Sequence, residues 1–198
     1  MITETSFIDT VEQLSFYGAY HSNKWNQVIH FVFVPLISWS VLVWTSSIHF
    51  GDSEKLDTSL LPDFVSRNVE PNLSLLLWMA FSVFYVFLEP FAGISWAAFV
   101  GLPLLVTSNM YSAVPGSSWH ALGTFVLGWY MQIHPGHMLL EGRRPALLDS
   151  FFQSIALAGL FVWIELLFAL GYRPGLYRRV RRAALKRIEA LDAQRKDG

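Results

Sequence analysis

The fold is decided by residues 90–140, PFAGISWAAFVGLPLLVTSNMYSAVPGSSWHALGTFVLGWYMQIHPGHMLL, which contain no Asp, Glu, Lys or Arg in 51 consecutive positions. In a soluble protein such a run would need burial on every side, because a surface helix places charged residues on its outer face. About 20 apolar residues are enough to cross the hydrocarbon core of a bilayer as a helix. Weak turn signals at residues 108–118 divide the run, and we expect two membrane segments, roughly Phe91 to Thr107 and Trp119 to Ile133.

The composition of the whole chain also favours a membrane protein. Its 198 residues are 53% hydrophobic and 15% charged, whereas soluble domains are about 25% charged. A large soluble helical protein is the alternative, and the uncharged run argues against it. The chain has no cysteine, which excludes disulfides and thiolate ligands, so any metal must be held by nitrogen and oxygen atoms.

Three further apolar runs lie outside this stretch, at Trp25 to Gly51, Leu73 to Leu88 and Phe151 to Leu170. Together with the two segments above, they predict an all-α, polytopic helical membrane protein with about five apolar helices. Residues 51–72, between the first two runs, are rich in Asp and Glu. They predict an acidic loop exposed to solvent.

The two ends of the chain differ from its middle. Residues 1–22 predict a short amphipathic helix that lies at the membrane surface or packs on the bundle, and residues 173–198 predict a basic helix suited to anionic lipid headgroups. We therefore expect a single membrane domain over residues 1–198, with the helical bundle at residues 25–172 and no nucleic-acid partner. Basic residues lie on both sides of residues 151–170, so the positive-inside rule leaves two possibilities open: this segment re-enters the membrane, or one of the earlier segments is not a full crossing.

Four of the six histidines form two pairs at the ends of apolar runs. His21 and His30 lie in YGAYHSNKWNQVIH, and on one continuous helix their spacing would place them on opposite faces. They converge only if the chain breaks at residues 22–23. His134 and His137 lie in QIHPGH, where the proline and glycine loosen the helix. Ionisable groups at membrane depth are costly without partners, so we interpret the two pairs as a metal site or a hydrogen-bonding network. Imidazole suits iron, zinc, copper and nickel, so the ligand type does not name the metal.

Residues around the second pair are candidates for further roles. In an α-helix His134, His137 and Glu141 fall at i, i+3 and i+7 and share one face. Glu141 is therefore a candidate catalytic base, a residue that orients a histidine, or a helix cap. Arg143 and Arg144 either bind a fatty-acid carboxylate bidentately or anchor the chain at the membrane interface.

Five other polar residues belong to the expected surroundings of the site. Asn26 and Gln132 are expected to support the ligands, and His120 is an alternative fourth ligand. Glu89 and Glu165 lie within apolar runs. Each either pairs with an arginine or takes part in substrate binding.

Two motifs resemble a known family. Residues 16–35, FYGAYHSNKWNQVIHFVFVP, and residues 128–150, GWYMQIHPGHMLLEGRRPALLDS, resemble the Mpo1-like proteins in the patterns Y-H-x-N-x-x-N-x-x-x-H and G-H-x-x-x-E-x-x-x-P-A. The resemblance runs from Leu14 to about Pro174. One departure is Lys24, which stands where the family commonly has a proline.

The resemblance implies a dioxygenase that depends on iron(II), Fe(2+), in the endoplasmic reticulum membrane, or in the cell membrane if the source is bacterial. Such an enzyme would use O2 to shorten a 2-hydroxy fatty acid by one carbon, a step of fatty acid α-oxidation in phytosphingosine degradation. The family's histidines fall on His21, His30 and His137, and His134 is expected as the fourth ligand. The substrate's hydroxyl and carboxylate, on adjacent carbons, would form a chelate for iron.

Two other functions fit parts of the sequence. A metal-dependent lipid hydroxylase or hydrolase is one, although membrane hydroxylases usually carry more histidine boxes than the single HxxH at residues 134–137. A non-enzymatic transporter of metal ions or protons is the other, with the histidines and Glu89 or Glu165 along its path. Bound iron, and O2 consumption with a 2-hydroxy fatty acid, would distinguish the dioxygenase from both.

Overall fold

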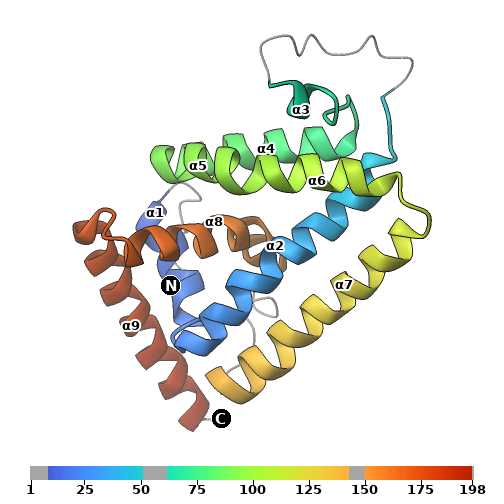
Figure 1. The fold of residues 1–198 in the computed structure, drawn as a ribbon. Helices are drawn as coiled ribbons and strands as arrows, with labels where there is room; N and C mark the ends of the chain where they lie inside the picture. Colours follow the sequence, from blue (N-terminus) through green and yellow to red (C-terminus); the bar gives the residue numbers. More distant parts are fainter. Residues whose placement is uncertain (1–8, 51–61, 143–149, 198) are drawn as a thin grey trace.

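A computed structural model describes residues 9–50, 62–142 and 150–197 of the chain. In these ranges the backbone is helical and no β-strand forms, which confirms the expected all-α class. The helices, drawn in Figure 1, are α1 (Thr10–Ala19), α2 (Lys24–Ser46), α3 (Asp63–Ser66), α4 (Leu73–Leu88), α5 (Pro90–Trp96), α6 (Leu102–Ser112), α7 (Ser117–Met131), α8 (Phe151–Ala169) and α9 (Pro174–Asp197), with π-helical segments η1 (Ala97–Gly101) and η2 (Gln132–Glu141).

The first two helices begin at polar N-cap residues. The Asp9 carboxylate accepts hydrogen bonds from the backbone N–H groups of Val11 and Glu12, at 2.9 and 3.2 Å. The Asn23 side chain does the same at the start of α2, accepting from Trp25 N–H at 2.9 Å. Each cap satisfies backbone donors that have no partner within the helix. Helix α1 ends at Ala19, and the Asn23 cap begins α2, which runs in a different direction.

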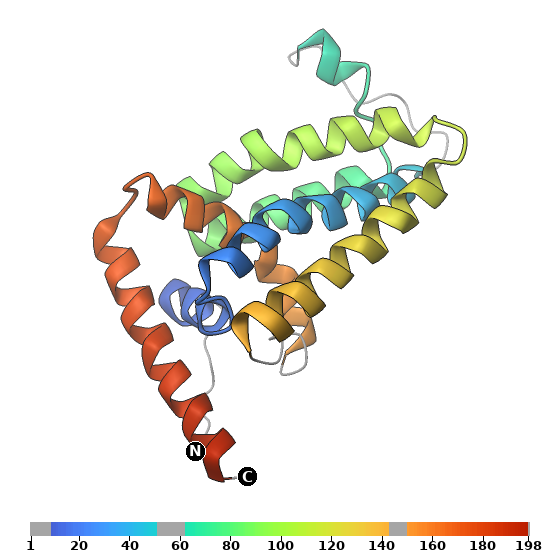
Figure 2. The ribbon, with the colours of Figure 1, turned by 60° about the horizontal axis from the view of Figure 1, so that its bottom comes forward.

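Helix α2 is the central element of the bundle. It contacts α4, α6, α7, α8 and η2, and Figure 2 shows it between α6 and α7. The main apolar core is formed by residues of α1, α4, α5, α8 and α9, and includes Tyr17, Tyr85, Leu160 and Ile164. Because α2 contacts five other elements, its side chains take part in several of the packing interfaces of the bundle.

Three helical stretches are long and apolar enough to cross a membrane, Lys24–Ser46, Pro90–Ser112 and Phe151–Ala169. The expected count of about five spans is not confirmed. Helix α4 has 16 residues, fewer than the roughly 20 that a hydrocarbon core requires. The second half of the long uncharged run is divided between α7 and the π-helical η2. The length and composition of these helices indicate association with a membrane.

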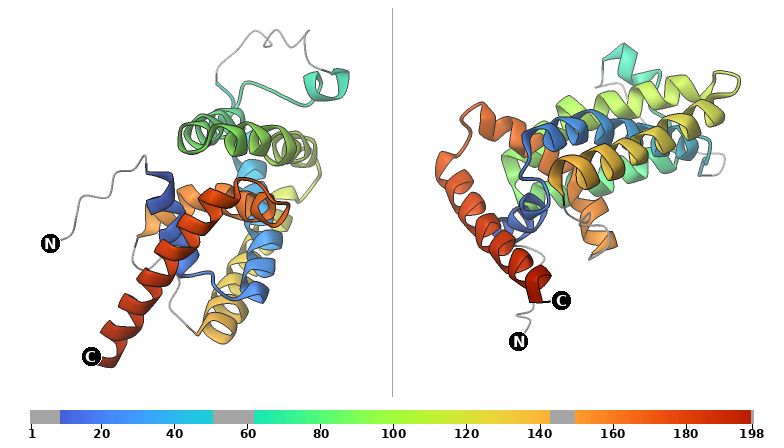
Figure 3. Two further views of the ribbon diagram at one scale, coloured as in Figure 1. Left: turned by 90° about the vertical axis from the view of Figure 1, so that its left-hand side faces the viewer. Right: turned by 90° about the horizontal axis from the view of Figure 1, so that it is seen from below.

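The two terminal helices pack against each other. Helix α9 contacts α1 along its length, and Figure 3 shows the C-terminal end of α9 extending beyond the bundle. The Arg187 guanidinium forms an ion pair with Glu12 and a hydrogen bond to the Ser15 hydroxyl, at 3.2 Å for the latter. Of the two places expected for the N-terminal helix, the structure therefore shows the one packed on the bundle.

Glu89 lies at the junction of α4 and α5 and is 3% exposed. Its carboxylate accepts hydrogen bonds from the backbone N–H of Ala92 at 2.6 Å, the Arg173 guanidinium at 2.7 Å and the Tyr172 hydroxyl at 2.9 Å. Because a buried carboxylate is stable only when it is paired, Arg173 explains the presence of this acid within an apolar run. Of the two roles expected for Glu89, pairing with an arginine or taking part in substrate binding, the structure shows the pairing with an arginine.

Candidate metal centre

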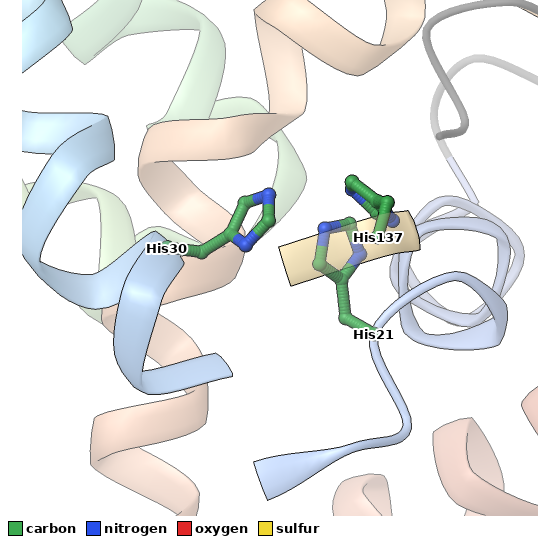
Figure 4. Close-up of side chains that lie close together, drawn as sticks. All are labelled: His21, His30 and His137. Carbon is green, nitrogen blue, oxygen red and sulfur yellow. The ribbon is translucent and has the colours of Figure 1, made fainter. Parts of the chain in front are cut away.

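Three histidines from separate elements converge in the interior. His21 lies in the turn between α1 and α2, His30 lies in α2, and His137 lies in η2. One ligand nitrogen from each lies within 4.8 Å of the other two. The ring centroids are 4.3 to 5.0 Å apart, and each side chain is 3% exposed. Figure 4 shows the three imidazoles facing one another.

The break before α2 brings the first two histidines together. His21 and His30 would lie on opposite faces of a continuous helix, and the expectation that residues 22–23 break the chain is confirmed by the Asn23 cap. Helix α1 and helix α2 therefore approach the same point from different directions. His30 projects from the inner face of α2 toward η2, which α2 contacts.

The π-helical form of η2 places His137. A π-helix joins residue i to residue i+5, so residues five apart lie on one face. Gln132 and His137 are five residues apart, as are Gly136 and Glu141. Gln132, Gly136 and His137 are buried. Pro135 lacks an N–H group and cannot donate an α-helical hydrogen bond. The inward face of η2 thus carries His137.

The structure does not bring His134 to the other three histidines. The expected shared face of His134, His137 and Glu141 assumed an α-helix, and the wider turn of η2 rotates His134 outward. His134 is exposed, with its ring stacked on Tyr130 at a centroid distance of 5.4 Å. The alternative fourth ligand, His120, is also exposed and lies 2.9 Å from the Tyr111 hydroxyl. The group that could hold a metal among the described residues therefore has three members.

Backbone hydrogen bonds orient two of the imidazoles. His21 Nδ1 lies 2.8 Å from the Tyr17 carbonyl oxygen, and His30 Nδ1 lies 3.0 Å from that of Asn26. A carbonyl can only accept, so each Nδ1 carries the proton and each Nε2 keeps a free lone pair. Such a second hydrogen bond is the usual arrangement of a metal-binding histidine.

The unpartnered nitrogens of the group fit a metal ion. His21 Nε2 and His137 Nδ1 are buried and have no hydrogen-bond partner among the described residues. Burial lowers the pKa of His21 well below its ordinary value, and the neighbouring His30 and His137 lower it further. His21 is therefore neutral at physiological pH, which is the form that binds metal. Buried nitrogens without partners are rare in native proteins, and a shared metal ion accounts for both.

The Glu141 carboxylate joins η2 to the start of α2. It accepts hydrogen bonds from the backbone N–H of Ser22 at 2.9 Å, the N–H of Asn23 at 2.9 Å and the Asn26 amide at 3.2 Å, and also from the Ser22 hydroxyl. In return, the Asn23 amide donates to the Leu140 carbonyl at 2.8 Å. Glu141 therefore positions the segments that carry all three histidines.

Gly136 allows this close approach of η2 and α2. A Cβ at Gly136 would lie 2.5 Å from Asn26 Oδ1, so any side chain would push the two elements apart. Asn26 itself is fully buried and donates to both Glu141 and the Tyr20 carbonyl. The expected supporting role of Asn26 thus has a structural basis in these contacts.

Two cavities flank the histidines. The larger, here called the histidine cavity, has a volume of about 540 Å³ and lies between α2, α7, η2 and α8. All three histidines line one end of it, together with Gln132 and Ser154. The second, of about 510 Å³, is lined by His21, His30 and residues that include Lys24 and Glu165. Arg143 and Arg144 lie outside the described residues.

Ser154 is a site residue that the sequence analysis missed. Its hydroxyl and the Gln132 amide nitrogen are both buried, and neither has a hydrogen-bond partner among the described residues. Both side chains line the histidine cavity. No motif marks Ser154, because its position depends on α8 lining the same cavity as η2.

The family model described as "2-hydroxy-palmitic acid dioxygenase Mpo1-like" matches residues 7–170. The chain belongs to the Mpo1-like family. This confirms the resemblance carried by the two histidine motifs, and the match includes every element that forms the Mpo1-like histidine group. The chain is also 36% identical over 169 residues to a Saccharomyces cerevisiae protein named 2-hydroxy-palmitic acid dioxygenase MPO1, covering 85% of this chain and 86% of the yeast protein. No solved structure matches this Mpo1-like chain.

The role of Glu141 in positioning the histidines can be tested by metal binding. We expect Glu141→Gln to lower the affinity for cobalt(II) by about 10- to 100-fold, because supporting contacts of this kind typically contribute that much. The visible absorption of cobalt bound to purified protein measures the affinity. The matched control is Glu70→Gln, since Glu70 is exposed and lies 3.6 Å from His49, another exposed residue. Equal affinities for the two variants would contradict this role.

Proposed function

We propose that this Mpo1-like protein is an iron(II)-dependent dioxygenase that shortens 2-hydroxy fatty acids by one carbon. The observation that carries the proposal is the group of three buried imidazoles at the polar end of an apolar cavity. Membership of the family and the name of the yeast relative support the substrate class and the use of O2.

The donor set agrees with iron. His21, His30 and His137 would hold the ion through three neutral imidazole nitrogens, a ligand type suited to iron. When bound, iron(II) would supply the one-electron chemistry that allows O2 to react with an organic substrate. His134 is not included among the proposed ligands, because it lies on the outer face of η2.

The histidine cavity suits a fatty acid with a polar head. Away from the histidines its walls are mainly apolar, with Val34 and Val41 from α2 and Phe125 and Trp129 from α7. An acyl chain gains about 0.8 kcal/mol for each methylene that it buries in such surroundings. The polar and apolar ends of the cavity therefore match the two ends of the substrate.

Two unpartnered donors are placed to bind the head of the substrate. The Gln132 amide nitrogen and the Ser154 hydroxyl are buried in the wall beside the histidines. We assign them to hydrogen bonds with the substrate carboxylate, which would satisfy both groups and hold carbon 2 beside the imidazoles. Of the two roles that the sequence leaves open for Arg143 and Arg144, we propose that they are charged partners of the same carboxylate.

The proposed reaction balances without an added reductant. One O2 and one 2-hydroxy acid give the acid shorter by one carbon, one carbon dioxide and one water. The bond between carbons 1 and 2 breaks, carbon 2 is oxidised to the new carboxyl group, and O2 is reduced. A lipid hydroxylase, in contrast, needs an external electron donor, so the requirement for a reductant distinguishes the two activities.

The membrane would deliver the substrate. The three membrane-length helices include α2 and α8, both of which line the histidine cavity. A 2-hydroxy fatty acid dissolved in the bilayer would thus reach the site from the side. We place the enzyme in the endoplasmic reticulum membrane, or the cell membrane of a bacterium, with phytosphingosine degradation as the source of the substrate in the former.

The proposed activity predicts the behaviour of the purified protein. In detergent with one iron per chain and no reductant, we expect O2 consumption and carbon dioxide release with 2-hydroxypalmitate and none with palmitate. Because His137 is a proposed ligand, His137→Ala should lose bound iron and activity while circular dichroism shows unchanged helicity. His134→Ala is the matched control and should keep both. Turnover after complete removal of iron, or equal losses in the two variants, would contradict the proposal.

The proposed role of Ser154 predicts a specific kinetic defect. We expect Ser154→Ala to raise KM for 2-hydroxypalmitate by about tenfold or more, since a hydrogen bond to a charged group contributes about 1.5–3 kcal/mol. Bound iron should not change, because Ser154 is not a ligand. Ser82→Ala is the control, as the Ser82 hydroxyl bonds the Trp78 carbonyl of its own helix at 2.7 Å. An unchanged KM in Ser154→Ala would overturn this assignment.

A further inference from the structure

A third cavity adjoins the far end of the histidine cavity. It has a volume of about 150 Å³ and lies between α2, α4, α6 and α8; we call it the distal cavity. Its walls include Leu77, Trp78 and Phe81 from α4 and Leu104 from α6. The two cavities share five wall residues: Ile37, Ser38 and Val41 of α2, and Ile155 and Ala158 of α8.

The shared wall offers a passage for hydrocarbon. Four of its five residues are apolar. The fifth is Ser38, whose hydroxyl donates a hydrogen bond to the Val34 carbonyl of its own helix at 3.0 Å. Within the distal cavity, the Trp78 indole N–H donates to the Ala97 carbonyl at 3.3 Å. Polar groups at these positions are thus satisfied within the protein. An apolar chain would enter without displacing their hydrogen bonds.

The distance from the histidines agrees with a long acyl chain. Val41 lies eleven positions after His30 along α2, which corresponds to about 16 Å at the rise of an α-helix. A short chain would end within the histidine cavity. A longer chain that starts at the histidines would reach the shared wall and need further buried space.

We propose that the distal cavity binds the methyl-terminal part of long-chain 2-hydroxy fatty acids, and that Ala158 controls access to it. This inference rests on the proposed function of the histidine site. Ala158 has the smallest side chain of the shared wall, so a larger side chain there narrows the passage between α8 and α2. The enzyme discriminates among chain lengths because longer chains bury additional methylenes in the distal cavity.

Photochemical labelling tests where the chain end lies, without requiring turnover. The probe is 2-hydroxypalmitic acid with a diazirine at its methyl end, and a 2-hydroxyoctanoic acid analogue is the short-chain control. We expect the long probe to label peptides of α4, and the short probe to label α7 or η2. Labelling of α7 by both probes, or of no residue in α4 by the long one, would overturn the inference.

A pair of alanine variants on α8 tests the control of access. In Ala158→Leu we expect the ratio of kcat/KM for 2-hydroxypalmitate to that for 2-hydroxyoctanoate to fall about tenfold or more, as a few methylenes lose their buried site. The matched control is Ala156→Leu, because Ala156 is half-buried and lines neither cavity. The ratio in this control should equal that of the wild type.

The two measurements separate failure of this inference from failure of the proposed function. If the wild type oxidises both acids but Ala158→Leu keeps the wild-type ratio, the inference on the distal cavity is wrong and the proposed function stands. If the wild type oxidises neither acid while the long probe labels α4, the proposed function is wrong and the distal cavity still binds the chain end.

Discussion

The hydrogen bonds from the start of α2 to the Glu141 carboxylate hold together the segments that carry the three histidines of the candidate metal centre. Neutral imidazoles have no net attraction for one another, and burying three of them costs free energy. His21 lies in the turn before α2, His30 lies in α2, and His137 lies in η2, more than a hundred residues later. Glu141 connects these segments through donors on Ser22, Asn23 and Asn26. Because Gly136 has no Cβ, η2 can approach Asn26 of α2 closely.

Several buried polar atoms around the histidines have no hydrogen-bond partner among the described residues. His21 Nε2, His137 Nδ1, Gln132 Nε2 and Ser154 Oγ are all buried without partners among the described residues. Each would cost free energy if left unpaired in the working protein. In the proposed function, a metal ion would satisfy the first two, and the head of a fatty acid would satisfy the others. The stability given up at these positions would then be recovered when the metal and the substrate bind, as is common at functional sites.

Much of this architecture could be predicted from the sequence, because it depends on local chemistry. The uncharged run indicated membrane helices, Asn23 indicated the break before α2, and that break indicated that His21 and His30 converge. The outward position of His134 could not be predicted, since the α-helical spacing does not hold in η2. Two further features depend on packing between distant segments: the pairing of Glu89 with Arg173, and the presence of Ser154 beside the histidines. The expected count of about five membrane spans is not confirmed: in the described residues three helical stretches are long and apolar enough to cross a membrane, and α4 is shorter than a span requires.

The central claim is that three histidines, His21, His30 and His137, hold one metal ion. X-ray absorption spectroscopy at the iron edge of the loaded, purified protein tests it most directly, because scattering from imidazole rings reports how many histidines bind. The account predicts three imidazoles in the wild type and the same three in His134→Ala. A spectrum with four imidazoles that loses one in His134→Ala, or a spectrum without imidazole scattering, would contradict it.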